Sequence, residues 1–134
     1  MKEKLLKLLD NAYAPYSNYK VAAIVVMNDG TEFEGVNIEN ASYGGTICAE
    51  RNAINAAVTK GYRKGDFKAI YLMVGSDEMA FPCLICRQSM VEFFDMDADL
   101  YLFSKSKEEH YKMSDIIVHA FSSEDLKWNQ DLLV

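Results

Sequence analysis

Apolar positions near the N-terminus recur with the period of a helix. Leu5, Leu8, Leu9 and Ala12 are spaced by three and four residues, and charged residues occupy the positions between them. This pattern predicts an amphipathic first helix with one face against a core. Pro15 disfavours helical geometry at the residue before it, so we expect the helix to end there.

The pattern then becomes that of a pair of strands. Residues 19–27 form a run rich in valine and isoleucine, which is typical of a strand buried on both faces. The sequence Asn-Asp-Gly at 28–30 predicts a hairpin turn. Residues 31–38 then return as a second strand, whose polar positions favour an exposed edge, and residues 40–46 have the composition of a loop.

The second half of the chain alternates helical and strand patterns. The predicted elements are a helix over 48–60 closed by Gly61, a strand over 68–74, a helix over 82–94, a strand over 100–104, a charged turn over 105–109, a short strand over 111–113 and a short helix over 114–118. Such alternation predicts an α/β fold with parallel strands in the sheet and helices on both faces. No repeat or linker interrupts residues 1–134, so we expect one domain. Trp128, Leu132 and Leu133 are candidate docking points in a polar tail.

Composition and charge narrow the class of partner. The 134 residues carry a net charge of −6, which argues against nucleic acid as a partner because a phosphate backbone requires a basic surface. The longest apolar run, residues 21–27, is too short to span a membrane. The N-terminus lacks the pattern of a signal peptide. An odd number of cysteines, three, disfavours a disulfide framework, so we expect a cytoplasmic protein.

The three cysteines lie at two predicted helix starts. Cys83 and Cys86 are one helical turn apart, and Cys48 opens another helical pattern. Thiolates at these positions can converge on one metal ion. Zinc binds thiolates in tetrahedral geometry, and three protein ligands with one open position are the catalytic form of such a site. Cys83 and Cys86 taken alone could also be a redox pair or a coincidence of spacing.

Other residues near the cysteines have alternative roles. His110 and His119 lie late in the chain and are more typical of surface or subunit-contact residues than of ligands. Three thiolates around Zn²⁺ leave a net charge of −1, which the positive ends of two helices can offset. Arg51 and Arg87 could donate hydrogen bonds to thiolates, or they could be ordinary surface or ion-pairing residues.

Glu50 raises a question of geometry. It lies two residues after Cys48, and on an ideal helix that spacing turns the two side chains to nearly opposite sides. Both can face one site only if Cys48 lies at the irregular start of the helix. A glutamate in the first turn is also favourable simply through its interaction with the helix dipole.

At these residues the sequence resembles the short-chain, zinc-dependent, homotetrameric cytidine deaminases. The matching stretches follow the family's order and spacing across nearly the whole chain. They are Ala-Pro-Tyr-Ser-Asn-Tyr at 14–19, Asn-Ile-Glu-Asn-Ala-Ser-Tyr-Gly at 37–44, Cys-Ala-Glu-Arg at 48–51, Pro-Cys at 82–83, Cys-Arg-Gln at 86–88 and Ala-Phe-Ser-Ser-Glu-Asp-Leu at 120–126. The resemblance implies a three-layer α-β-α fold with a mixed sheet of about five strands.

The resemblance also implies a reaction. Cys48, Cys83 and Cys86 would hold one Zn²⁺ per chain, with an activated water as the fourth ligand. Glu50 would move a proton from that water to N3 of cytosine and then to the leaving amine. Cytidine, and 2′-deoxycytidine, would become uridine or deoxyuridine with release of ammonia, in pyrimidine salvage. Arg51 would neutralise thiolate charge.

Further residues would bind the substrate if the resemblance holds. Backbone groups around Ala49 would contact the pyrimidine edge, and Tyr19 would lie against the base. Asn37 and Glu39, which project to one side of a strand end, would hold ribose hydroxyls. Phe121 would reach a neighbouring subunit's pocket, so the active sites would lie at subunit interfaces of a homotetramer. Without the resemblance, we would interpret Asn37 and Glu39 as exposed polar residues at a strand end. Tyr19 and Phe121 would then be interpreted as core residues.

Two positions depart from the family's pattern. Ala22 and Leu84 stand where the family usually has glycine, and their bulk could reshape the pocket. A blasticidin-type or other nucleoside-analogue deaminase would share the zinc motifs, but Asn-Ile-Glu-Asn at 37–40 argues against it. A non-catalytic, zinc-stabilised scaffold is the alternative from a different class, and it would have no need of Glu50.

Overall fold

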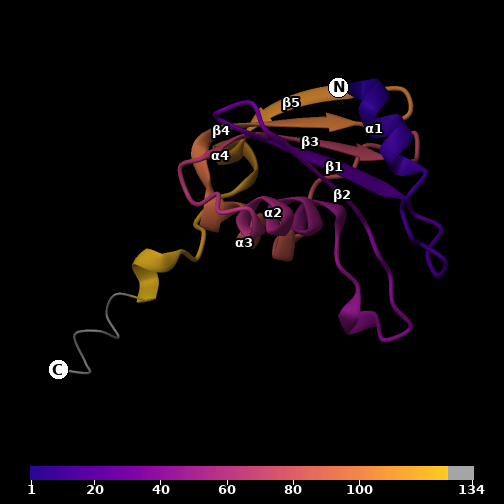
Figure 1. Ribbon diagram of the computed structural model, residues 1–134, viewed down its shortest axis with the longest axis horizontal. Coiled ribbons are helices and arrows are strands. Elements are labelled where there is room, and N and C mark those ends of the chain that lie inside the picture. Colours follow the sequence, from indigo (N-terminus) through magenta and orange to yellow (C-terminus); the bar gives the residue numbers. More distant parts are fainter. Residues whose placement is uncertain (127–134) are drawn as a thin grey trace.

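The computed structural model describes residues 1–126 and contains a five-stranded sheet with four α-helices (Figure 1). The helices are α1 (Lys2–Leu9), α2 (Ala49–Thr59), α3 (Leu84–Phe93) and α4 (Met113–Ile116). The strands are β1 (Val21–Met27), β2 (Glu32–Val36), β3 (Phe67–Val74), β4 (Phe94–Phe103) and β5 (Glu108–Lys112). Two short 3₁₀ helices are η1 (Tyr43–Gly45) and η2 (Ser123–Leu126). The candidate docking points Trp128, Leu132 and Leu133 lie outside the described residues.

The sheet is mixed, as the sequence predicts. Its strand order is β2-β1-β3-β4-β5. β3 and β4 are parallel, whereas the other neighbouring strands are antiparallel. The hairpin between β1 and β2 turns at Gly30, whose φ of +89° suits a residue without a side chain. The parallel pair requires a crossover connection, and α3 provides it.

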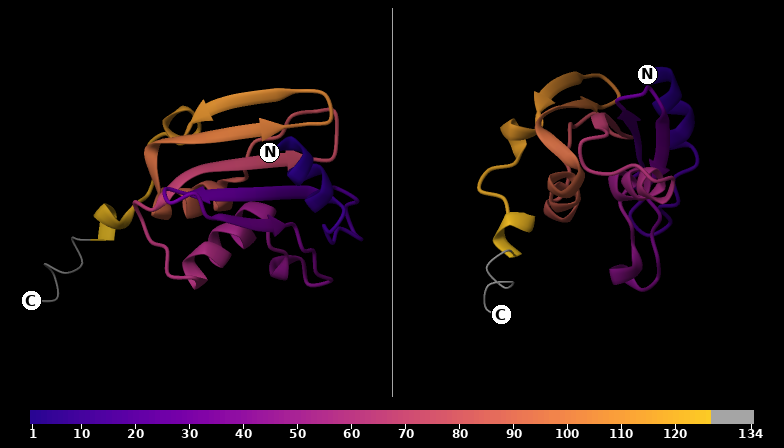
Figure 2. Two further views of the ribbon diagram at one scale, coloured as in Figure 1. Left: turned by 45° about the horizontal axis from the view of Figure 1, so that its top comes forward. Right: turned by 60° about the vertical axis from the view of Figure 1, so that its left-hand side comes forward.

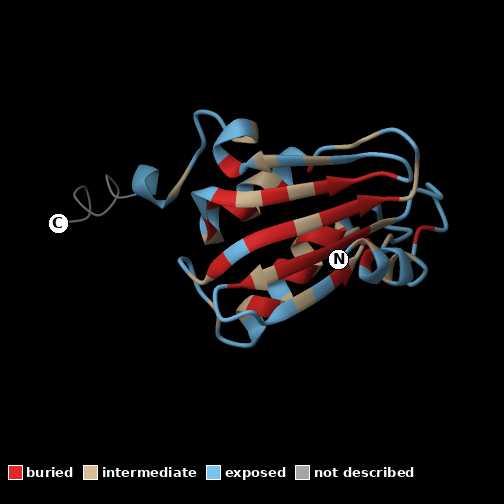
Figure 3. Cartoon of the chain, turned by 90° about the horizontal axis from the view of Figure 1, so that it is seen from above, coloured by how far each residue is buried: buried red, intermediate tan, exposed pale blue. Residues whose placement is uncertain are grey.

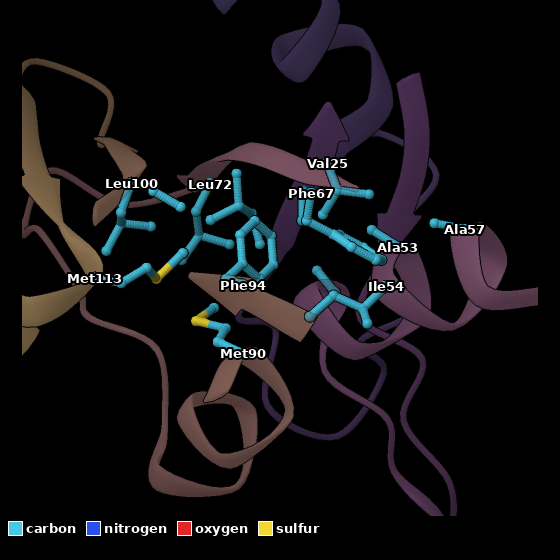
Figure 4. Close-up of a cluster of buried hydrophobic side chains, with 14 of the residues drawn as sticks. Val25, Ala53, Ile54, Ala57, Phe67, Leu72, Met90, Phe94, Leu100 and Met113 are labelled. Atoms are coloured by element: carbon cyan, nitrogen blue, oxygen red, sulfur yellow. The ribbon is translucent and has the colours of Figure 1, made fainter. Parts of the chain in front are cut away.

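Alternating side chains of the central strands supply two separate cores. On one face, Val25 of β1 and Leu72 of β3 pack with Ile54 of α2 and Met90 of α3 (Figure 4). On the other face, strand residues pack against Leu5 of α1. Helices therefore cover both faces of the sheet, which confirms the predicted layers; Figure 2 shows α1 and the α2–α3 pair on different sides.

Burial follows this arrangement across the sheet. β1 is buried along most of its length (Figure 3). The edge strand β5 alternates exposed with partly buried residues, and the edge strand β2 does so until Gly35, which is buried. Of the helices in residues 1–126, none is long and apolar enough to cross a membrane.

A close approach of α2 to β2 depends on a single glycine. A Cβ added at Gly35 would lie 2.4 Å from the carbonyl oxygen of Ala49 and 2.5 Å from the amide nitrogen of Ala53. These distances are too short for any real side chain, so only glycine lets the helix lie directly on the strand. Gly35 thereby fixes the position of the first turn of α2.

The predicted end of the first helix was wrong. α1 ends at Leu9, before the proline that was expected to stop it. The backbone explains the difference, because the N–H of Tyr13 donates to the carbonyl of Asn37 and the N–H of Glu39 donates to the carbonyl of Tyr13, both at 2.9 Å. Tertiary pairing with the strand end therefore takes the chain out of the helix several residues early.

The bounds of the last two strands also differ from prediction. β4 begins at Phe94, directly after α3, and its first six residues include Asp95, Asp97 and Asp99. Aspartate is uncommon in strands, so the pattern of hydrophobic and polar residues did not predict a strand over these positions. β5 includes Glu108 and Glu109, which were assigned to a turn, and His110, which was assigned to no element, and Met113 begins α4 rather than ending a strand. A charged edge strand with exposed side chains has little hydrophobic signal to detect.

Candidate metal centre and active site

The N-termini of α2 and α3 bring the three cysteines together. Cys48 is the residue before α2 and is extended, with φ −68° and ψ 154°, and Cys83 is the residue before α3, with φ −65° and ψ 167°. Cys86 lies in the first turn of α3 and is fully buried. The three sulfur atoms all lie within 4.8 Å of one another. The predicted convergence of two helix starts is confirmed.

The spacing and chemistry of this set suit zinc. The Sγ atoms of Cys48 and Cys83 are 3.9 Å apart. Tetrahedral Zn²⁺ with bonds of about 2.3 Å to sulfur places neighbouring thiolates roughly 3.8 Å apart. Three thiolates leave one tetrahedral position for water or substrate. The set fits one zinc ion per chain, and His110 and His119 are not part of it.

Hydrogen bonds and helix ends stabilise negative charge on the sulfur atoms. Nη2 of Arg51 donates to Sγ of Cys48 at 3.5 Å, and the backbone N–H of Cys86 donates to Sγ of Cys83, also at 3.5 Å. The hydrogen bond from the Cys86 thiol lowers the pKa of Cys48 to about 5, and the Arg51 guanidinium adds to this effect. Because Cys86 is the donor in that bond, its own pKa is raised. The site therefore favours a thiolate even without a metal.

Glu50 faces the same site as the cysteines. Only 4% of its surface is exposed, and it lines one cavity together with Cys48 and Cys83. Burial raises the pKa of the Glu50 carboxyl to about 7, and the nearby Cys48 thiolate contributes to the rise. The extended conformation of Cys48 is the irregular helix start that the sequence requires for both side chains to share a site. A carboxyl with this pKa can accept and return a proton at neutral pH.

The cavity extends from the cysteines to the ends of β1 and β2. Its volume is about 320 Å³, within the range of small-molecule sites. Four of the predicted substrate-binding residues line it or its rim: Tyr19, Asn37, Glu39 and Ala49. Among the described residues, its lining includes no lysine or arginine. A larger hollow of about 730 Å³ lies beside η2 and holds none of the cysteines.

Asn37 and Glu39 are both hydrogen-bonded to the chain around Tyr19. The Asn37 side chain accepts from the N–H of Val21 at 2.9 Å and donates to the carbonyl of Tyr19 at 2.7 Å. The Glu39 carboxylate accepts from the backbone N–H groups of Tyr16 and Ser17. These hydrogen bonds fix both side chains at the cavity wall. Asn37 and Glu39 are therefore not simply exposed polar residues at a strand end.

Other predicted residues lie outside the cavity of their own chain. Phe121 is 56% exposed and lines a separate hollow with Leu84. Arg87 is neither a thiolate partner nor a free surface residue, because it donates to the backbone carbonyls of Pro82 and Ile116 at 2.8 and 2.9 Å. His110 is paired with Asp99 at 2.8 Å.

Ala22 and Leu84, which stand where the family usually has glycine, both lie outside the lining of the cavity. Ala22 is fully buried, on the face that packs against Leu5 of α1. Leu84 is 77% exposed. Sequence reasoning missed other wall residues, namely Ser17, Thr46 and Phe81. Ser17 belongs to the stretch 14–19 that matches the family, but serine is so common in turns that this residue alone did not indicate a role in the site.

The site can be compared with known proteins. A family model described as the cytidine and deoxycytidylate deaminase zinc-binding region matches residues 1–101. The chain belongs to the cytidine deaminase family. It is 36% identical over 120 residues to a cytidine deaminase of Mycoplasma genitalium, covering 89% of this chain and 91% of that protein. It is 37% identical over 125 residues to one of Halalkalibacterium halodurans, with 92% and 93% covered.

Solved structures of the family share the fold. The crystal structure of a cytidine deaminase from Burkholderia pseudomallei superposes with a TM-score of 0.84 at 40% identity, covering 89% of this chain and 94% of that one. One from Mycobacterium leprae gives a TM-score of 0.72 at 31% identity, with 87% and 93% covered. The mixed sheet and its helices are thus those of cytidine deaminases.

Proposed function

We propose that this chain catalyses the hydrolytic deamination of cytidine and 2′-deoxycytidine, releasing ammonia and forming uridine or deoxyuridine. One observation carries the proposal: a buried carboxyl, Glu50, faces the same cavity as a three-thiol zinc set. A zinc-stabilised scaffold has no use for a buried carboxyl beside its metal ligands, and the Glu50 residue is only 4% exposed in the cavity that it lines with Cys48 and Cys83. Membership of the cytidine deaminase family supports the same reaction.

Different residues of the protein bind the metal, transfer protons and stabilise the thiolates. When bound by the three cysteines, zinc supplies the Lewis acidity that makes water nucleophilic near neutral pH. Glu50 takes the proton that water loses as it adds to C4 and places it on N3; it then takes the proton of the new C4 hydroxyl and gives it to the leaving amino group. Arg51 and the ends of α2 and α3 hold the thiolates in their charged form.

The remaining cavity residues orient the nucleoside. Ala49 is the first residue of α2, so its N–H has no acceptor within the helix and can donate to the pyrimidine edge. Tyr19 is among the residues that line the cavity, and its aromatic ring can pack on the base. Asn37 and Glu39 present polar atoms for sugar hydroxyls.

The charge of the cavity favours a nucleoside over a nucleotide. Among the described residues its lining includes two carboxylates and no lysine or arginine. The Ser17 hydroxyl lowers the pKa of Glu39, which keeps that carboxylate charged. A 5′-phosphate near Glu39 would therefore meet repulsion that no lysine or arginine of the lining balances.

A homotetramer with active sites at subunit interfaces accounts for the exposed apolar residues. Phe121, Leu84 and Ile85 are exposed by 56%, 77% and 64%. Exposed apolar side chains of this size are typical of a protein interface, which supports an assembly in which Phe121 reaches the cavity of a second chain. The three free cysteines need a reducing compartment to remain zinc ligands, so we place the protein in the cytoplasm, in pyrimidine salvage.

A spectrophotometric assay tests the proposed reaction. Zinc-loaded protein is mixed in turn with cytidine, 2′-deoxycytidine, deoxycytidine monophosphate and blasticidin S, and absorbance loss and ammonia release are followed. We expect turnover of both nucleosides and at least tenfold lower kcat/KM with the monophosphate. Zinc-loaded protein that is inert toward both nucleosides would refute the proposal.

Mixed oligomers test the shared active site. Phe121→Ala and Glu50→Gln chains are each assayed alone and then after unfolding and refolding together. If Phe121 acts on a neighbouring chain, mixing restores activity, because some sites combine Glu50 of one chain with Phe121 of the other. A mixture no more active than the sum of its parts contradicts this arrangement.

A further inference from the structure

The carboxylate of Glu39 is held by one short loop. Its Oε1 accepts from the backbone N–H of Tyr16 at 2.9 Å and from that of Ser17 at 3.1 Å. Its Oε2 accepts from the hydroxyl of Ser17. Three donors from two adjacent residues therefore converge on one partly exposed side chain.

The number of these bonds limits what else the carboxylate can accept. A carboxylate offers about four lone-pair positions, two on each oxygen. The backbone donors occupy both positions on Oε1 of Glu39, and the Ser17 hydroxyl occupies one on Oε2. One acceptor position remains, on the oxygen that Ser17 orients. Both residues line the cavity that contains Cys48, so that position is available to a hydroxyl of a bound ligand.

The Ser17 hydroxyl has a second partner on the same side of the cavity. Its oxygen accepts from the backbone N–H of Tyr19 at 3.0 Å, while the carbonyl of Tyr19 accepts from Nδ2 of Asn37 at 2.7 Å. The backbone of Tyr19 is thus held at both its donor and its acceptor. One hydroxyl links the carboxylate at the sugar end of the cavity to the residue that carries the aromatic ring.

The local backbone is shaped to make this link. Asn18 has a φ of +58°, a left-handed conformation that asparagine tolerates better than most residues. Its N–H donates to the carbonyl of Ala14 at 2.9 Å, which closes a tight turn. The turn points the Ser17 side chain back toward Glu39. The loop after α1 therefore orients a side chain of the cavity wall.

We propose that Ser17 is a positioning residue for the sugar of the substrate, which directs the one free acceptor position of Glu39 toward a ribose hydroxyl. This inference rests on the proposed nucleoside deaminase function and extends it to Ser17, a residue of the cavity wall. Its effect is exerted through Glu39, so it should be specific to substrates that carry the hydroxyl.

The test compares Ser17→Ala, Ser17→Thr and a matched control with two substrates. Ser76→Ala is the control, because it also removes one serine hydroxyl from a loop, but one that donates to the backbone carbonyl of Glu78 and has no bond to Glu39. Each zinc-loaded variant is assayed with cytidine and with 2′,3′-dideoxycytidine, which lacks the ribose 2′ and 3′ hydroxyls. Zinc content and the thermal midpoint are measured on the same samples.

For Ser17→Ala we expect the KM for cytidine to rise about tenfold with kcat within about twofold of wild type, the loss expected of a misdirected charge-assisted hydrogen bond. With dideoxycytidine the same variant should differ from wild type by less than about twofold. Ser17→Thr keeps the hydroxyl and should restore the cytidine KM, and Ser76→Ala should match wild type.

An equal loss with both substrates would overturn the inference, because Ser17 would then act through general folding or through Tyr19 alone. An unchanged cytidine KM would overturn it as well. The result is distinct from a failure of the proposed function, since that failure would already appear in wild-type protein as absence of turnover with cytidine.

Discussion

Cys48 precedes the first turn of α2 in an extended conformation, and Glu50, two residues later, faces the same cavity. On a regular helix these side chains would diverge. The extended backbone at Cys48 removes the conflict, so a metal ligand and a proton-transfer group come from one helix start. The position of that helix start is itself set by Gly35, which allows α2 to lie against β2.

Gly35→Ala should therefore disrupt both the fold and the site. Its Cβ would meet the backbone of Ala49 at 2.4 Å, and a backbone cannot rotate away as a side chain can. We expect the free energy of unfolding to fall by at least about 2 kcal/mol and zinc content to fall with it. Urea unfolding and metal analysis check this.

Gly44→Ala is the matched control for that substitution. A Cβ at Gly44 meets nothing within 4 Å, so stability and zinc content should remain at wild-type values. If the two variants were equally stable, the close packing of α2 on β2 would not be what positions the site.

Asn37→Ala should lower stability as well as substrate affinity. Asn37 is only 8% exposed, and its loss would leave the N–H of Val21 and the carbonyl of Tyr19 without the partners that they have now. Each such loss costs about 1–3 kcal/mol, so urea unfolding should show a decrease of that order. Asn55→Ala, on the exposed side of α2, should leave the unfolding midpoint unchanged or higher. An Asn37→Ala protein as stable as wild type would contradict this role.

Arg51→Gln should weaken zinc binding. Arg51 donates to Sγ of Cys48 at 3.5 Å, and loss of a partner of a metal ligand typically lowers metal affinity about 10- to 100-fold. Competition with a chromophoric chelator measures the change. Arg63→Gln, at the other end of α2 where the side chain donates to the carbonyl of Val58, is the control and should bind zinc normally. Equal zinc affinities for the two variants would rule out the proposed contribution of Arg51.

The sequence allowed the fold class and the metal ligands to be predicted because both leave strong local signals. Two helix starts with cysteines at the right spacing identify a three-thiol set whose sulfur atoms do lie within 4.8 Å. Alternation of helices and strands indicated a sheet with parallel strands and helices on both faces, and the resemblance to the family implied that the sheet is mixed. These features depend on periodicity and residue chemistry within short windows, which a single sequence records directly.

Features that depend on tertiary contacts could not be predicted in this way. α1 ends early because Tyr13 pairs with a distant strand end. The aspartates of β4 are tolerated because Asp95 and Asp97 are exposed and Asp99 pairs with Lys112 and His110. The constraint on Gly35 comes from a helix that is remote in sequence. The role of the Ser17 hydroxyl depends on Glu39, 22 residues later, and no local pattern indicates that contact.

The central claim is that Glu50 transfers protons at the three-cysteine zinc site. The most direct measurement is the cytidine kcat of Glu50→Gln together with its zinc content, each relative to wild type. We predict that kcat falls by about 10³-fold or more while about one zinc per chain remains bound, because glutamine keeps the shape of the side chain and cannot accept the proton. A zinc-loaded Glu50→Gln protein that deaminates cytidine at a rate near that of wild type would contradict the account.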